Sequence, residues 1–158
     1  MSTDRTLLRH TLATLAYRGG KTIRDANPDF ATYGAPDSSR TPVKILAHIG
    51  DLMDWALTMA EGNQKWNNST PLPWDKEGHR FHASVKKFDD YLASDAPLQA
   101  MPEKLFQGPI ADALTHVGQL AMLRRLAGCP IKGENYFAAE ITTGRVGADQ
   151  AAPRNPFD

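Results

Sequence analysis

The chain has 158 residues, enough for one domain with its own hydrophobic core and too few to require a second. Eighteen basic residues balance eighteen acidic ones, and no cluster of Lys and Arg suggests a nucleic-acid surface. No apolar run approaches the roughly 18 residues of a membrane span, and the N-terminus lacks a signal-peptide apolar region. We therefore expect a single cytoplasmic domain over residues 1–158 that binds neither nucleic acid nor a membrane.

The first segment with helical periodicity runs from about Thr3 to Ala26 and ends at Asn27-Pro28. From Asn27 to Arg40 the sequence is rich in Pro, Gly, Ser and Asp and shows no periodicity, which predicts a long connection. Long connections in small domains are often functional or cross the end of a helical bundle.

The second predicted helix, 42–61, has clear ends. Thr41 suits the N-cap, Pro42 suits the first helical position, and Gly62 follows the last periodic residue. Its apolar face carries Ile45, Ile49, Leu52, Met53, Ala56, Met59 and Ala60. His48 and Trp55 lie at one flank of that face.

Two further helices are predicted after a turn-rich connection over 63–74. The third, 75–94, presents Phe81, Val85, Phe88 and Leu92 on one side. Prolines bracket the next link, and the fourth helix covers 109–127, between Pro109 and Gly128. Four amphipathic segments without a convincing strand predict an all-α fold, a four-helix bundle.

The C-terminal region contains one short candidate helix, 135–141, followed by an irregular tail over about 142–158. Its Gly, Ala and Pro content suggests that the tail is mobile or packed across a partner. The lone Cys129 excludes an internal disulfide and a cysteine-based zinc site. Its place after Gly128 favours a packing residue over a catalytic thiol.

A polar row in the fourth helix is the most informative feature of the sequence. Asp112, His116 and Gln119 fall inside the predicted apolar arc of about 140°, with Arg125 on the opposite side. An imidazole and a carboxylate are costly to bury without partners. A bound cation is the most economical way to satisfy them.

Helical phase separates the five histidines. His10 points away from the apolar face of the first helix. His79 and His82 lie outside the apolar face of the third helix, so we expect all three histidines at the surface. His48 and His116 lie on or beside buried arcs. A histidine in such a position is more often a satisfied core residue than a metal ligand.

Asp112 favours the metal-ligand interpretation of His116, because it lies one turn before His116 and both are predicted to point inward. With His48 from another helix, two imidazoles and one carboxylate would form an open site for Zn, Ni, Fe or Mn. The alternative is a salt bridge between Asp112 and His116, with His48 hydrogen-bonded elsewhere. Spacing alone leaves both interpretations open.

Two segments carry a resemblance to a known family. Residues 41–56 (TPVKILAHIGDLMDWA) and 112–128 (DALTHVGQLAMLRRLAG) resemble the DinB/YfiT-like superfamily of small bacterial helical bundles. The resemblance covers most of the chain, from the first helix to the fourth. It implies an up-down-down-up four-helix bundle with a short C-terminal extension, often dimeric.

In that family a His of the second helix joins a His-x-x-x-His pair of the fourth to hold a divalent metal. By position His48 matches the first of these ligands and His116 the last, while Gly118-Gln119 resembles the end of the family's HisArgGlyGln run. Asp112 stands where the first histidine of the pair would be. Carboxylate is a competent ligand, so a site made of His48, Asp112 and His116 is expected.

We therefore expect a divalent-metal-binding protein with a metal-dependent activity. Gln119 would orient a ligand or the substrate from beyond the metal's direct ligands. Some relatives resemble thiol transferases and others hydrolases, and we rank transfer of a small-molecule thiol above hydrolysis. The alternative is a non-enzymatic stress-related or small-ligand-binding bundle with a degenerate metal site. The long connection over 27–40 and the tail leave room for a homodimer.

Overall fold

The computed structural model describes residues 1–34 and 40–157, and these are predominantly helical. The all-α prediction is confirmed at this level. None of the described helices is long and apolar enough to span a membrane. The long helices are α1 (Thr3–Ile23), α2 (Pro42–Glu61), α3 (Trp74–Ala93) and α5 (Ala111–Leu126). Shorter elements are η1 (Phe30–Thr32), α4 (Pro102–Leu105), the π-helical turn η2 (Phe106–Ile110), and the strands β1 (Gly133–Glu134) and β2 (Pro156–Phe157).

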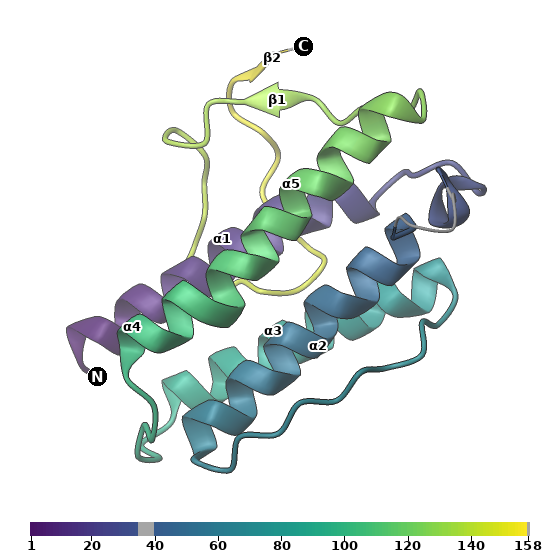
Figure 1. Cartoon of the computed structure of the whole chain (residues 1–158). Helices are drawn as coiled ribbons and strands as arrows, with labels where there is room; N and C mark the ends of the chain where they lie inside the picture. Colours follow the sequence, from purple (N-terminus) through teal and green to yellow (C-terminus); the bar gives the residue numbers. More distant parts are fainter. Residues whose placement is uncertain (35–39, 158) are drawn as a thin grey trace.

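The long helices form a bundle-like arrangement of two pairs, with α1 beside α5 and α2 beside α3 (Figure 1). Contacts between α1 and α3 and between α2 and α5 join the pairs. One cluster of buried apolar side chains fills the space between them and includes Leu12, Leu15, Ile49, Met53, Phe81, Phe88 and Leu120. The candidate site lies between α2 and α5, one helix from each pair.

A long connection joins α2 to α3 and runs beside these helices (Figure 1). It starts at Gly62, whose left-handed φ of 83° ends α2 as the sequence predicts. Two buried carboxylates then hold it: Asp51 Oδ2 accepts from the backbone N–H of Ser69 at 3.1 Å, and Glu77 Oε1 accepts from that of Leu72 at 2.9 Å. This connection therefore lies fixed against α2.

Helix α1 ends at Ile23, three residues before the predicted Ala26. The cause lies on α5, where the buried Arg124 donates to the backbone carbonyls of Arg24 at 2.7 Å and Asp25 at 3.2 Å. The guanidinium satisfies carbonyls that a longer helix would bond internally, so the chain turns away. The predicted connection over 27–40 contains η1, and its residues 35–39 lie outside the described ranges.

The fourth predicted helix begins earlier than expected. Helical backbone starts at Pro102 and passes through η2 before α5, so the predicted start at Pro109 was wrong. Pro109 has no N–H and clashes with a regular α-helical turn, whereas the wider π turn accommodates it without ending the helix. At the other end, Gly128 follows α5 with a φ of 77°.

The tail differs most from its prediction. Residues 135–141 form turns rather than a helix, because Asn135 accepts from the N–H of Phe137 through its side chain and from that of Ala138 through its carbonyl. Strands β1 and β2 form a short antiparallel pair that periodicity did not predict. The tail then lies against its own chain, where Val146 joins the hydrophobic core.

Candidate metal centre

The imidazoles of His48 on α2 and His116 on α5 lie opposite each other. Their ring centroids are 4.8 Å apart and the rings are nearly perpendicular, at 88°. The phase of the two helices predicts this juxtaposition, although it joins residues 68 positions apart in sequence. The core contacts between α2 and α5 fix it, because each histidine adjoins buried residues of its own helix.

Asp112 completes a group of three possible ligands. Its Oδ1 lies 3.4 Å from His116 Nε2 and its Oδ2 lies 3.8 Å from His48 Nε2. One ligand atom from each residue lies within 4.8 Å of the other two. Ligands at about 2.1 Å from a tetrahedral cation are separated by about 3.4 Å, so small side-chain rotations would bring all three to bonding distance.

Gln119 holds the His116 ring in one orientation. Its Oε1 lies 2.7 Å from His116 Nδ1, a hydrogen bond in which the ring nitrogen donates to the amide oxygen. The other ring nitrogen, Nε2, is the one that faces Asp112. The distances from Asp112 to both histidines are too long for a good hydrogen bond.

Burial lowers the pKa of His48 below its ordinary value, and the charges of Arg40 and His116 lower it further, against the opposing effect of Asp112. A neutral imidazole can bind a metal. The salt-bridge interpretation pairs Asp112 with the other ring, that of His116, so the lowered pKa of His48 is consistent with both interpretations.

The burial of the polar row was predicted wrongly. The buried side of α5 is centred on Ala113, Val117, Leu120 and Arg124, roughly 80° from the predicted centre. Asp112 and Gln119 are exposed, and the side chain of Asp112 keeps 49% of its exposed area. Arg124 caused the error, because its buried guanidinium occupies a position that an apolar pattern treats as solvent-facing. The site is therefore an open edge between α2 and α5 and not a buried pocket.

An aromatic wall of Trp66 and Trp55 covers one side of His48. The Trp66 ring lies 5.6 Å from the His48 ring, and the Trp55 ring lies 5.7 Å from that of Trp66. Trp66 belongs to the fixed connection between α2 and α3. Trp55 shares the predicted flank of the second helix with His48, whereas a connection carries no periodic signal that could assign Trp66 to the site.

The remaining histidines lie outside this group. His10 and His79 are exposed as predicted. His82 is half-buried under the tail, with its Nδ1 3.2 Å from the carbonyl oxygen of Val146, so its predicted surface position was wrong. The polar face of α3 is covered there by a segment whose course the helical pattern of α3 cannot show.

Comparison of the chain with protein families, with curated proteins and with solved structures finds no match in any of the three. The resemblance of residues 41–56 and 112–128 to the DinB/YfiT-like superfamily therefore stays a prediction. What the structure contributes is the proximity of His48, Asp112 and His116.

Proposed function

We propose that this chain is a divalent-metal-binding protein of the DinB/YfiT-like class, with His48, Asp112 and His116 as ligands. The observation that carries the proposal is the proximity of one ligand atom from each of the three residues, all within 4.8 Å of one another. The Asp112 carboxylate lies 3.4 Å from His116 Nε2 and 3.8 Å from His48 Nε2, too far for a good hydrogen bond to either ring. A cation in contact with all three residues would satisfy them together.

The donor set suits a particular group of metals. Two imidazole nitrogens and one carboxylate oxygen are typical of Zn, Ni, Fe or Mn rather than Ca or Mg. Three protein ligands leave at least one coordination position free. Because the Asp112 side chain is half-exposed, that free position would face solvent and be accessible to a substrate.

The up-down-down-up arrangement of the resemblance belongs to the same proposal. It requires a long connection between the second and third helices, because two neighbouring helices that run the same way cannot be joined by a tight turn. The connection between Glu61 and Trp74 has this length and runs beside the helices (Figure 1). The homodimer expected from the resemblance stays a prediction.

For the reaction we propose transfer of a small thiol to an electrophile, ranked above hydrolysis. A bound divalent cation supplies Lewis acidity and lowers the pKa of a coordinated thiol or water. The residues of this chain then have separate tasks. Gln119 holds the His116 ring with Nε2 facing Asp112, and Trp66 shields one side of His48 from water.

The test is metal binding by the untagged protein. Elemental analysis after purification in metal-supplemented medium should give one divalent metal per chain. Adding Zn²⁺ or Co²⁺ to metal-free protein should raise the melting temperature, because a ligand of the folded state alone stabilises it.

Two histidine variants make the test specific. His116→Ala should abolish the metal-dependent rise, and His79→Ala, which removes an exposed histidine outside the group, should keep it. Protein without metal after supplementation would favour the non-enzymatic binding protein instead. An undiminished rise in His116→Ala would place the metal elsewhere.

A further inference from the structure

We propose that the candidate metal centre selects small organic anions, with Arg40 and Lys44 binding the ligand's carboxylate and an adjoining apolar groove taking its hydrocarbon portion. The inference rests on the proposed function, because the ligand's second donor would complete the coordination of the metal. It adds the charge and shape of the substrate, which neither the ligand set nor the resemblance specifies.

The apolar part of this surface lies on the His116 side. A groove of about 430 Å³ is lined by the apolar side chains of Ile45, Met122 and Leu123 and by the polar side chains of Arg40, His116 and Gln119. This volume falls within the range of small-molecule sites, about 300–1,000 Å³. A ligand bound to the metal through one atom could therefore extend over apolar side chains without leaving the groove.

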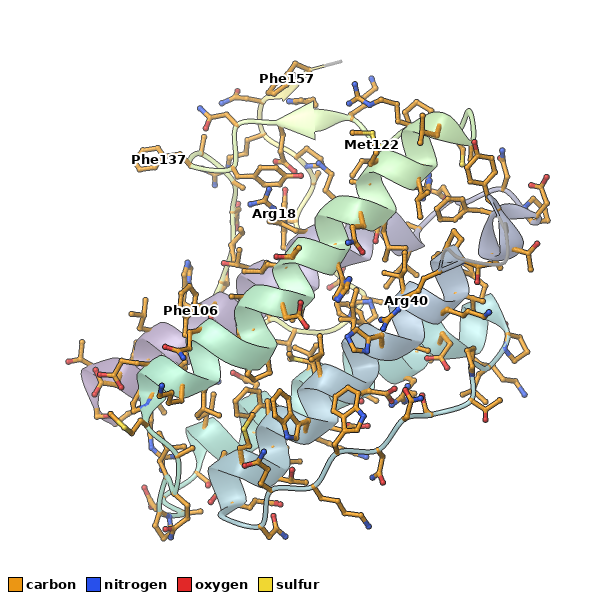
Figure 2. All side chains as sticks on the ribbon, viewed as in Figure 1. Arg18, Arg40, Phe106, Met122, Phe137 and Phe157 are labelled. Atoms are coloured by element: carbon orange, nitrogen blue, oxygen red, sulfur yellow. The ribbon has the colours of Figure 1, made fainter. Side chains whose placement is uncertain are left out.

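The polar part lies on the His48 side. A second hollow of about 230 Å³ is lined by Arg40, Lys44, His48 and Asp51, together with the connection residues Asn68, Ser69 and Pro71. Arg40 lines both hollows, and it lies where α2 faces α5 (Figure 2). A negatively charged ligand in either hollow would thus lie close to the Arg40 guanidinium.

The two cations are available to a ligand. Within residues 1–34 and 40–157, neither Arg40 nor Lys44 forms an ion pair with a carboxylate. The nearby Asp51 does not neutralise them, because Arg80 and the Ser69 N–H already bind both of its oxygens. Arg40 and Lys44 are exposed, whereas the half-buried Arg80 is engaged within the fold.

Arg40 lines the same hollow as His48, so its positive charge favours an anion beside the proposed ligands. An arginine binds a carboxylate through two parallel N–H donors, so it would orient a carboxylate as well as attract it.

Three thiols of different charge test the inference on the Co²⁺-loaded protein. In 3-mercaptopropionate, 2-mercaptoethanol and cysteamine the metal donor is the same, and the other end is anionic, neutral or cationic. The thiolate-to-cobalt absorption band reports binding of each. We expect 3-mercaptopropionate to bind at least about fivefold more tightly than 2-mercaptoethanol, and cysteamine to bind most weakly.

Arg40→Gln should remove most of the preference for 3-mercaptopropionate over 2-mercaptoethanol, measured as the ratio of the two affinities within the same variant. The matched control Lys87→Gln removes one exposed charge from α3, outside the lining of both hollows, and should keep the preference. Equal affinities for the three thiols, or an unchanged preference in Arg40→Gln, would overturn the inference and leave the metal site standing. Failure of Co²⁺ to bind the parent protein would instead overturn the proposed function, and the inference with it.

Discussion

Two polar clusters touch the helical core of this protein, and they are built in opposite ways. Near the tail, Lys21 and Glu134 form an ion pair of 2.8 Å, and the Tyr17 hydroxyl donates to both oxygens of Glu134 at 2.9 Å. Side-chain exposure is 8% for Lys21 and 0% for Glu134. Burial and the Glu134 carboxylate raise the pKa of Tyr17 to about 12, so its hydroxyl stays a donor.

The candidate metal centre has the reverse character. The carboxylate of Asp112 is half-exposed, and its distances to His48 and His116 are longer than hydrogen bonds. The first cluster is closed because its donors and acceptors satisfy one another, which serves stability. The second leaves three possible ligand atoms within 4.8 Å of one another beside a half-exposed carboxylate, an arrangement that suits a ligand site.

Breaking the closed cluster should have the largest effect on stability. Lys21→Met leaves the buried Glu134 carboxylate without its counter-charge, which costs about 3–5 kcal/mol. Urea unfolding should show this loss as a lower midpoint. The exposed pair of Lys86 and Asp90 provides the control, because Lys86→Gln should cost less than about 1 kcal/mol. Equal losses in the two variants would mean that Lys21 and Glu134 are not a structural pair.

A second substitution separates charge from packing in that cluster. Adding Glu134→Leu to Lys21→Met removes both charges, and apolar replacement of a whole buried pair is often close to neutral. The double variant should therefore regain part of the stability lost in Lys21→Met. A further loss as large as the first would show that Glu134 anchors β1 chiefly through Tyr17.

Changing the open cluster should alter metal binding more than stability. Asp112→His should retain or strengthen binding, because it restores the His-x-x-x-His pair of the resemblance, and Asp112→Ala should weaken it. At a metal concentration of 100 times Kd, binding adds about 2.7 kcal/mol of stability, which thermal unfolding resolves. A loss of stability in metal-free Asp112→His would favour the salt-bridge interpretation instead.

The sequence predicted those parts of the molecule that depend on periodicity and helix ends. The ends of α2 follow from Thr41, Pro42 and Gly62, and the meeting of His48 with His116 follows from helical phase. The errors arose where distant segments intervene. Arg124 ends α1 early and rotates the buried side of α5, an effect that depends on carbonyl groups about 100 residues away.

The same limit applies to the candidate site. His48, Asp112, His116 and Gln119 lie on helices, so phase could bring them together. Trp66 and the hollows around Arg40 depend on connections, whose course is set by long-range contacts such as the one between Asp51 and Ser69. Charge and spacing within one segment do not encode those contacts.

The smallest predicted effect concerns pH and the contact between α3 and the tail. Burial lowers the pKa of His82, and the positive charges of Arg24 and His79 lower it further, while the Val146 carbonyl raises it. In the unfolded chain a histidine titrates near pH 6.5, so below that pH the unfolded state binds more protons than the folded state. The free energy of unfolding should therefore have its highest value above pH 6.5. It should fall as the pH drops towards the pKa of His82 in the folded state.

Urea unfolding at pH 7.5, 6.5 and 5.5 measures this slope. His82→Gln should reduce it, because glutamine keeps a polar side chain beside the Val146 carbonyl but does not titrate. His79→Gln, at an exposed position of the same helix, is the matched control and should leave more of the slope in place. Metal-free protein is required, since His48 has a lowered pKa of the same sign and metal would add its own pH dependence. A slope unchanged in His82→Gln would show that burial under the tail does not disfavour the charged ring.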